Sequence, residues 1–95
     1  MILFHAEASR ELQEVLGWYL ERSPAAASKF ASGVSKAVTD IDADPERFGH
    51  LHGDFQYARV FGFPYIVVYQ RRADRNTVLA IAHTGQREKY WIDRR

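Results

Sequence analysis

The sequence predicts an α+β fold: an N-terminal strand, a helical hairpin and then an antiparallel β-meander, forming one sheet with both helices on one face. Three observations lead to this prediction. Apolar residues recur at helical spacing in the first half, a Ser-Pro step divides that half in two, and runs rich in Val, Ile, Tyr and Phe follow. With 95 residues, 46% of them hydrophobic, the chain is expected to form one domain, residues 1–95.

The first half of the chain indicates a short strand and two helices. Residues 2–5 are predicted to form the strand, and residues 7–22 carry one continuous apolar stripe at helical spacing. Ser23 and Pro24 end that helix and open the next, because serine is a favoured N-cap and proline a favoured first helical residue. The second helix is expected to stop at Asp44, since a residue before proline is disfavoured in the α region.

The second half changes to a pattern typical of strands. Residues 56–61, 64–70 and 77–83 are the predicted strands, and residues 46–54 form a loop or a weak strand. Only short segments connect these strands, whereas a parallel crossover needs about a dozen residues or more. The second half is therefore expected to be an antiparallel meander.

Composition excludes several classes of protein. The chain has no cysteine, which rules out disulfides, thiolate zinc sites and thiol nucleophiles. No stretch approaches the roughly 20 apolar residues of a membrane span, and the N-terminus lacks the pattern of a signal peptide. We therefore expect a cytoplasmic protein that does not bind a membrane. His50 and His52 are compatible with half of a zinc site, but no metal or cofactor is predicted.

Charge is distributed unevenly between the two halves. Residues 1–54 carry five basic and nine acidic side chains, whereas residues 55–95 carry eight basic and three acidic ones. This asymmetry predicts that the C-terminal half faces an anionic partner. In the alternative interpretation, charges of the two halves interleave once the chain folds.

The C-terminal segment is both basic and aromatic, which suits a phosphate backbone, a base stack or an acidic protein surface. The last two strands are expected to bring its side chains to one edge of the domain. The predicted target-binding residues are His83, Arg87, Lys89, Tyr90, Trp91, Arg94 and Arg95. Tyr90 and Trp91 have an alternative role, in which they pin the segment onto the core.

Several short motifs follow one another along the chain. They are Phe4-His5 before Ala6-Glu7-Ala8 and Glu11-Leu12, Tyr19 with Glu21-Arg22-Ser23-Pro24, Asp44-Pro45-Glu46-Arg47-Phe48, Phe63-Pro64-Tyr65 with Val68-Tyr69, Val78 to His83, and Arg87 with Tyr90-Trp91. In order and spacing they resemble the RelE/ParE superfamily, the toxin halves of bacterial toxin–antitoxin pairs. The resemblance covers nearly the whole chain and is closer to the ParE-like branch.

The resemblance implies a function. ParE-like toxins inhibit DNA gyrase and so block replication, with no bond-breaking chemistry of their own. A cognate antitoxin, whose C-terminal segment wraps the helices and sheet of the toxin, neutralises them in a hetero-oligomer. The residues expected to bind the antitoxin are Leu12, Leu16, Trp18, Tyr19, Leu20, Arg59 and Arg71. Trp18 and Leu20 are included because they lie off the apolar stripe of the first helix, although Trp18 has packing against the neighbouring helix as an alternative.

Two alternatives remain open. A RelE-like toxin would cut mRNA on the ribosome, which without a metal needs a general base, a general acid and cations at the scissile phosphate. Arg59, His83, Arg87 and Tyr90 are the residues available for those roles, although Arg59 is the only cation between residues 56 and 70. The other alternative is a degenerate member that binds an antitoxin but poisons nothing.

Overall fold

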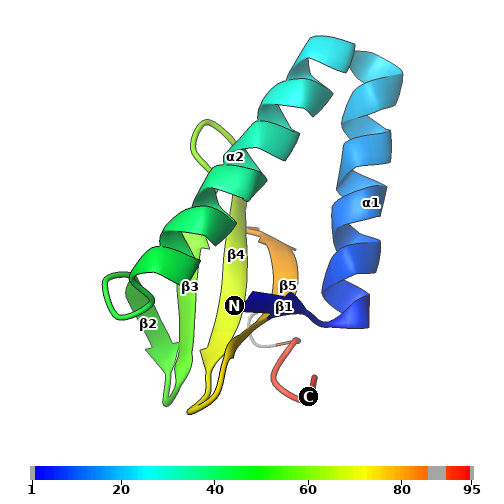
Figure 1. Ribbon diagram of the computed structural model, residues 1–95. Helices are drawn as coiled ribbons and strands as arrows, with labels where there is room; N and C mark the ends of the chain where they lie inside the picture. Colours follow the sequence, from blue (N-terminus) through cyan, green and yellow to red (C-terminus); the bar gives the residue numbers. More distant parts are fainter. Residues whose placement is uncertain (1, 86–89, 95) are drawn as a thin grey trace.

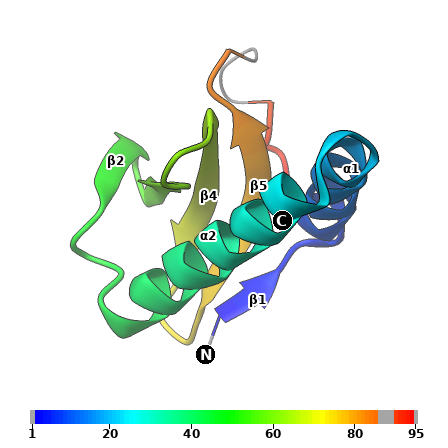
Figure 2. The same ribbon diagram turned by 90° about the horizontal axis from the view of Figure 1, so that it is seen from above.

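The computed structural model, which describes residues 2–85 and 90–94, has two helices on one face of a five-stranded sheet (Figure 1). The elements are β1 (Ile2–Phe4), α1 (Ala6–Arg22), α2 (Pro24–Ala43), β2 (Gly49–His52), β3 (Phe55–Arg59), β4 (Tyr65–Arg71) and β5 (Asn76–His83). The strand order in the sheet is β1-β5-β4-β3-β2. Figure 2 shows α2 crossing one face of this sheet. The predicted α+β architecture is confirmed.

The caps of the helices follow from local sequence. The Ser23 hydroxyl accepts a hydrogen bond from the Ala26 backbone N–H at 3.2 Å, and Pro24 is the first residue of α2, as predicted. Asp44 is the C-cap of α2. His5 is the N-cap of α1, because its Nδ1 accepts from the Glu7 N–H at 3.0 Å. The first strand therefore ends one residue earlier than the sequence predicted.

The strands differ from the prediction in two respects. Residues 49–52, predicted as a loop or a weak strand, form β2, which pairs antiparallel to β3 at the sheet's edge. In addition, β1 runs parallel to β5 at the opposite edge, a long-range pairing that sequence periodicity does not reveal. β3 ends at Arg59, so Phe61 lies in the following turn, where Gly62 has a φ of +83°.

Both faces of the sheet are packed. On the helix side, Phe30 and Ile41 of α2 are buried with Val67 and Tyr69 of β4. On the other side, Trp91 of the C-terminal segment joins a second buried cluster formed with β4 and β5. The turn after α2 is fixed by the Tyr69 hydroxyl, which donates to the Pro45 carbonyl at 2.6 Å.

The free edge of β5 is closed by an ion pair. β1 pairs with β5 only as far as Val78. Beyond that residue, backbone groups at this edge of β5 form hydrogen bonds with side chains instead. Arg94 Nη1 donates to the Leu79 carbonyl at 2.9 Å, and the Ile81 N–H donates to Glu11 Oε1 at 3.1 Å. The two side chains bind each other through two hydrogen bonds of 2.9 and 3.0 Å. This pair joins α1, β5 and the C-terminal segment.

Replacing Glu11 by Gln tests this pair. The side chains of Glu11 and Arg94 are 12% and 14% exposed, so loss of the carboxylate leaves a largely buried guanidinium without its counter-charge. We expect the free energy of unfolding, measured in urea, to fall by about 2–3 kcal/mol. Lys36→Gln, which breaks the exposed pair with Asp40, is the control and should cost less than about 1 kcal/mol. Equal losses in the two variants would contradict the assigned role.

Because of Tyr69, the free energy of unfolding is expected to depend on pH in the alkaline range. Burial raises the pKa of Tyr69 from 10 to about 12, so the unfolded chain loses the phenolic proton first as pH rises. This contribution to stability is fully present below pH 10 and is lost as the pH rises through about 12. Urea unfolding of Tyr69→Phe between pH 9 and 11 should therefore show a smaller decline in stability than the unaltered chain. Identical declines would exclude the effect.

Candidate functional site

The described part of the C-terminal segment, which includes residues predicted to bind the target, packs mainly inside the molecule. Trp91 is only 5% exposed in the second core cluster, so its packing role holds and little of its ring is available to a target. The Arg94 guanidinium donates hydrogen bonds to the Glu11 carboxylate and to the Leu79 carbonyl. Arg87, Lys89 and Arg95 of the predicted set lie outside the described residues.

His83 and Tyr90 border a groove between α1 and the sheet. The His83 ring contacts Tyr65 edge-on, with centroids 5.1 Å apart, and its Nδ1 accepts from the Gly85 N–H at 2.9 Å. Two adjoining hollows of about 460 and 480 Å³ share Tyr65 and His83 as lining residues. Burial raises the pKa of Tyr65. Burial is also the main cause of the raised pKa of Tyr90, and the neighbouring Glu11 carboxylate adds to the increase.

The four residues considered for RNA cleavage are not brought together on one surface. Arg59 pairs across the sheet with Ile66, which packs in the cluster on the far face, whereas His83 pairs with Tyr65, which packs on the helix side. Arg59 and His83 therefore project from opposite faces of the sheet. Arg87 lies outside the described residues, which also contain no group of three or more His, Asp or Glu side chains arranged to hold a metal.

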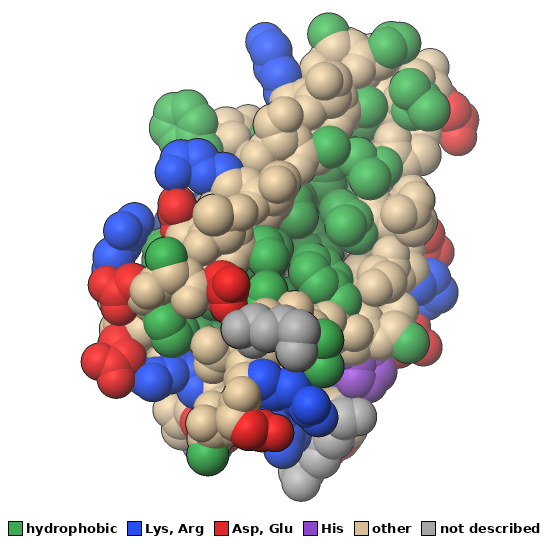
Figure 3. Space-filling view, viewed as in Figure 1, with side chains coloured by type: hydrophobic (Ala, Val, Ile, Leu, Met, Phe, Trp, Pro, Cys, Tyr) green, Lys and Arg blue, Asp and Glu red, His purple; other side chains and the backbone are tan. Residues whose placement is uncertain are grey.

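An apolar groove runs between the two helices. It has a volume of about 290 Å³, and Figure 3 shows hydrophobic side chains gathered along it. Leu12 and Leu16, both predicted to bind an antitoxin, line it from α1. The other lining residues are Phe4, Ala31, Val34, Ser35, Val38 and Thr39.

The remaining predicted antitoxin-binding residues on α1 lie in different environments. Trp18 and Leu20 are 53% and 58% exposed, in agreement with their positions off the apolar stripe, and the Arg22 guanidinium stacks 3.8 Å from the Trp18 ring centroid. Tyr19 instead faces inward, with its ring centroid 5.5 Å from that of Phe30. Its predicted role as a contact residue is weakened, because the aromatic core uses one of its faces.

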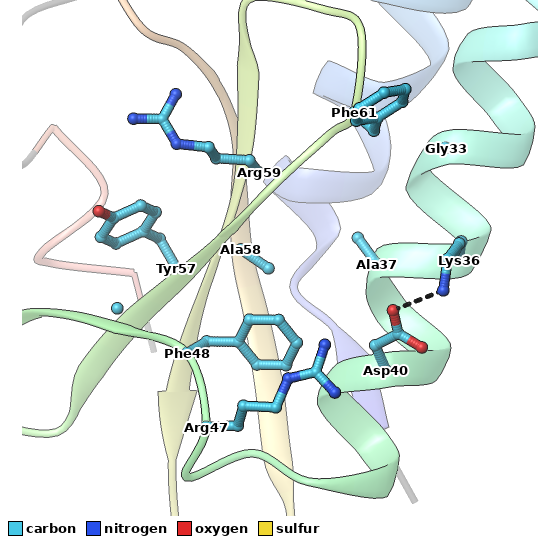
Figure 4. Close-up of a pocket in the computed structure, with 11 residues that line it drawn as sticks. Gly33, Lys36, Ala37, Asp40, Arg47, Phe48, Tyr57, Ala58, Arg59 and Phe61 are labelled. Atoms are coloured by element: carbon cyan, nitrogen blue, oxygen red, sulfur yellow. Dashed lines mark hydrogen bonds and ion pairs between the residues drawn. The ribbon is translucent and has the colours of Figure 1, made fainter.

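A basic pocket of about 460 Å³ lies between α2 and β3. Figure 4 shows Lys36 and Asp40 of α2 on one wall, joined by an ion pair of 2.9 Å, with Arg47 below them and Arg59 on β3. Within residues 2–85 and 90–94, Arg47 and Arg59 have no ion pair, although Arg47 stacks on the Phe48 ring at 4.8 Å.

Sequence analysis identified only Arg59 of these cations. Lys36 and Arg47 were missed because they lie on separate elements, and only the tertiary packing of α2 against β3 brings them together. Arg71, also predicted to bind an antitoxin, pairs with Glu46 at 3.3 Å and does not line this pocket.

Comparison with known proteins agrees with this architecture. A family model described as the ParE toxin of the type II toxin–antitoxin system parDE matches residues 2–89. Among solved structures, a chain from "Chromosomal ParDE TA system from P. aeruginosa" superimposes with a TM-score of 0.74 at 12% identity, over 86% of this chain and 92% of that one. No curated protein matches. Over the residues that the structure describes, neither helix is long and apolar enough to cross a membrane.

Proposed function

The chain belongs to the ParE toxin family of type II toxin–antitoxin systems, and on that premise we propose that it inhibits DNA gyrase and is held inactive by a cognate antitoxin. The observation that carries the proposal is the family match, which extends over residues 2–89 and therefore includes the whole helical hairpin and sheet. The structural likeness to a chain of a ParDE system supports the same assignment at the level of the fold.

The antitoxin is expected to cover the groove between α1 and α2. The groove is open and apolar, and its lining comes from positions one helical turn apart on both helices, such as Leu12 and Leu16. Grooves of this kind accept the apolar face of an amphipathic helix. The exposed apolar surface would be a liability for an isolated chain, which supports a permanent partner.

A mechanism without bond cleavage fits the arrangement of side chains better than the nuclease alternative does. General acid–base cleavage needs its proton-transfer groups and its phosphate-binding cations within hydrogen-bond reach of one substrate. Arg59 and His83, on opposite faces of the sheet, do not meet that condition. Inhibition by binding a target enzyme requires no such constellation.

The order in which macromolecular syntheses stop tests the proposed target. The chain is induced in bacteria without its antitoxin, and incorporation of labelled thymidine and labelled methionine is followed in short pulses. We expect DNA synthesis to fall first, because a stalled gyrase blocks replication directly. An earlier fall of protein synthesis would favour the ribosome-dependent nuclease, and no change in either would indicate a member that binds an antitoxin without poisoning the cell.

A substitution in the helix groove tests the antitoxin surface. Leu16→Arg places a charge where the proposed partner helix would bury apolar side chains, and antitoxin affinity should fall at least about tenfold, or 1.4 kcal/mol. Toxicity should then persist when the antitoxin is co-expressed. The matched control is Gln13→Arg, which adds the same charge at an exposed position of α1 outside the groove. Circular dichroism of both variants checks the fold. Unchanged affinity in a folded Leu16→Arg variant would remove the groove from the interface.

A further inference from the structure

We propose that a hollow between α1 and the end of the sheet binds the guanidinium group of an arginine side chain that projects from the target enzyme. The hollow has a volume of about 460 Å³, and we call it the aromatic hollow. Glu14, Trp18 and Tyr19 line it from α1, and Pro64, Tyr65 and His83 line it from the sheet side. The inference deepens the proposed function, on which it rests for the source of the arginine.

Trp18 gives the hollow an exposed aromatic wall. It is 53% exposed and lines the hollow together with Tyr65. Arg22, one turn later on α1, stacks over the indole with its guanidinium carbon 3.8 Å from the ring centroid. Glu14, which also lines the hollow, lies one turn before Trp18, so the hollow is on the side of the indole away from Arg22. An aromatic face attracts a cation, as the contact with Arg22 illustrates.

Glu14 places a carboxylate beside this wall. Its side chain is 63% exposed, and within the described part of the chain its ion-pair partner is Arg10, at 2.7 Å. Arg10 also pairs with Glu7, at 2.6 Å. Two negative charges against one positive charge leave this group of three negative, and Figure 3 shows acidic side chains along the outer side of α1. The charge beside the hollow therefore favours a cationic ligand.

The adjoining hollow of about 480 Å³ shows the same recognition within the molecule. The Arg94 guanidinium carbon lies 4.9 Å from the centroid of the Tyr90 ring, and the guanidinium donates hydrogen bonds of 2.9 and 3.0 Å to Glu11. Glu14 and Trp18 follow Glu11 at positions three and seven, on the same side of α1. The aromatic hollow thus repeats, one turn further along the helix, the combination of a carboxylate and a ring that holds Arg94.

An arginine side chain fits this combination better than a lysine or an apolar side chain. A guanidinium is planar, so it can stack on a ring while it donates two parallel hydrogen bonds to a carboxylate. An ammonium group is a compact and strongly hydrated charge without that geometry. A purely apolar ligand would cover the Glu14 carboxylate without offering it a hydrogen bond. The methylene stem of an arginine would pack on Pro64 and Tyr65.

The aromatic hollow and the groove between the helices lie on different sides of α1. Leu12 and Leu16, one turn apart, line the groove, whereas Glu14 and Trp18, also one turn apart, line the hollow. At 3.6 residues per turn, the two pairs are about 160° apart around the helix axis. An antitoxin helix in the groove therefore leaves the hollow open. For this reason we assign the hollow to the target enzyme rather than to the antitoxin.

The first test is a titration of the full chain with N-acetylarginine N-methylamide, a blocked arginine, followed by NMR. The chain has two tryptophans, so the indole N–H signals of Trp18 and of the buried Trp91 act as separate reporters, and Trp18→Phe assigns them. We expect the Trp18 signal to shift at millimolar probe and the Trp91 signal to stay in place. The corresponding citrulline probe, which has the same shape without the charge, should bind at least about tenfold more weakly.

Two results of this titration would overturn the proposal. One is a Trp18 signal that does not respond to the arginine probe. The other is a citrulline or lysine probe that binds as tightly as the arginine probe, since the site would then not recognise a guanidinium group.

A matched pair of variants tests the carboxylate. Glu14→Gln should weaken binding of the arginine probe about threefold to tenfold, the range expected for a partly exposed charged contact. Glu21→Gln removes the same charge from an exposed position of α1 outside the hollow and should leave the affinity unchanged. Circular dichroism checks the fold of both variants. Equal affinities of the two folded variants would overturn the role of Glu14.

Agmatine distinguishes a protein from a free small molecule as the source of the guanidinium group. It carries this group on a similar stem but has no peptide bonds. We expect agmatine to bind no more tightly than the blocked arginine. An affinity for agmatine more than about tenfold higher would overturn a protein source.

Induction of variants in bacteria tests the target enzyme as that source. Glu14→Lys places a like charge beside the expected guanidinium, so inhibition of DNA synthesis at equal toxin level should fall at least about tenfold while antitoxin affinity is unchanged. Glu21→Lys is the control and should inhibit as the unaltered chain does. Full inhibition by a folded Glu14→Lys variant would overturn the assignment of the hollow to the target.

The outcome is separable from that of the proposed function. If the unaltered chain stops DNA synthesis but the arginine probe does not bind, the hollow is wrong and the proposed function stands. If the probe binds in a manner that depends on Glu14 while the unaltered chain leaves DNA synthesis intact, the guanidinium site stands and the gyrase proposal falls.

Discussion

The architecture depends on how the backbone N–H and C=O groups at the two edges of the central sheet find hydrogen-bond partners. A buried N–H or C=O group without a partner destabilises the folded state, and β1 is only three residues long. Beyond Val78, the carboxylate of Glu11 and the guanidinium of Arg94 therefore serve β5 as a strand would, by accepting from Ile81 and donating to Leu79. The same pair fixes the C-terminal segment against α1, and Trp91 then seals the far face of the sheet.

At the opposite edge of the sheet, where β2 and β3 lie, the backbone groups also need partners, but no ion pair comparable to Glu11 and Arg94 covers them among the described residues. β2 is exposed along its whole length, and among the described residues its pairing with β3 ends at Gly49, opposite Tyr57, so Arg59 lies beyond the end of the β2 pairing. Proteins usually protect such edges with charge or with a covering segment. Here Arg47 and Arg59 supply charge of one sign only, which discourages pairing between like copies.

Features encoded by neighbouring residues could be predicted from the sequence, whereas those that depend on distant contacts could not. The step from α1 to α2 follows from Ser23 and Pro24 alone, and the meander from its short connections. Arg94, however, resembles any other cation of a basic tail, and its partner Glu11 lies 83 positions away. Likewise, Tyr19 belongs to the apolar stripe of the first helix, but the sequence pattern does not show that its ring packs against Phe30. The basic pocket was missed for the same reason, since its cations belong to three elements.

The ion pairs of the structure explain part of the uneven distribution of charge along the chain. Part of the C-terminal basic excess is neutralised internally, because Arg94 binds Glu11 and Arg71 binds Glu46, both acidic residues of the first half. The interleaving interpretation thus accounts for these cations. It does not account for Arg47 and Arg59, which have no ion pair among the described residues. Both of these cations line the pocket between α2 and β3, so the basic excess that remains after internal pairing lies where the two halves of the chain meet.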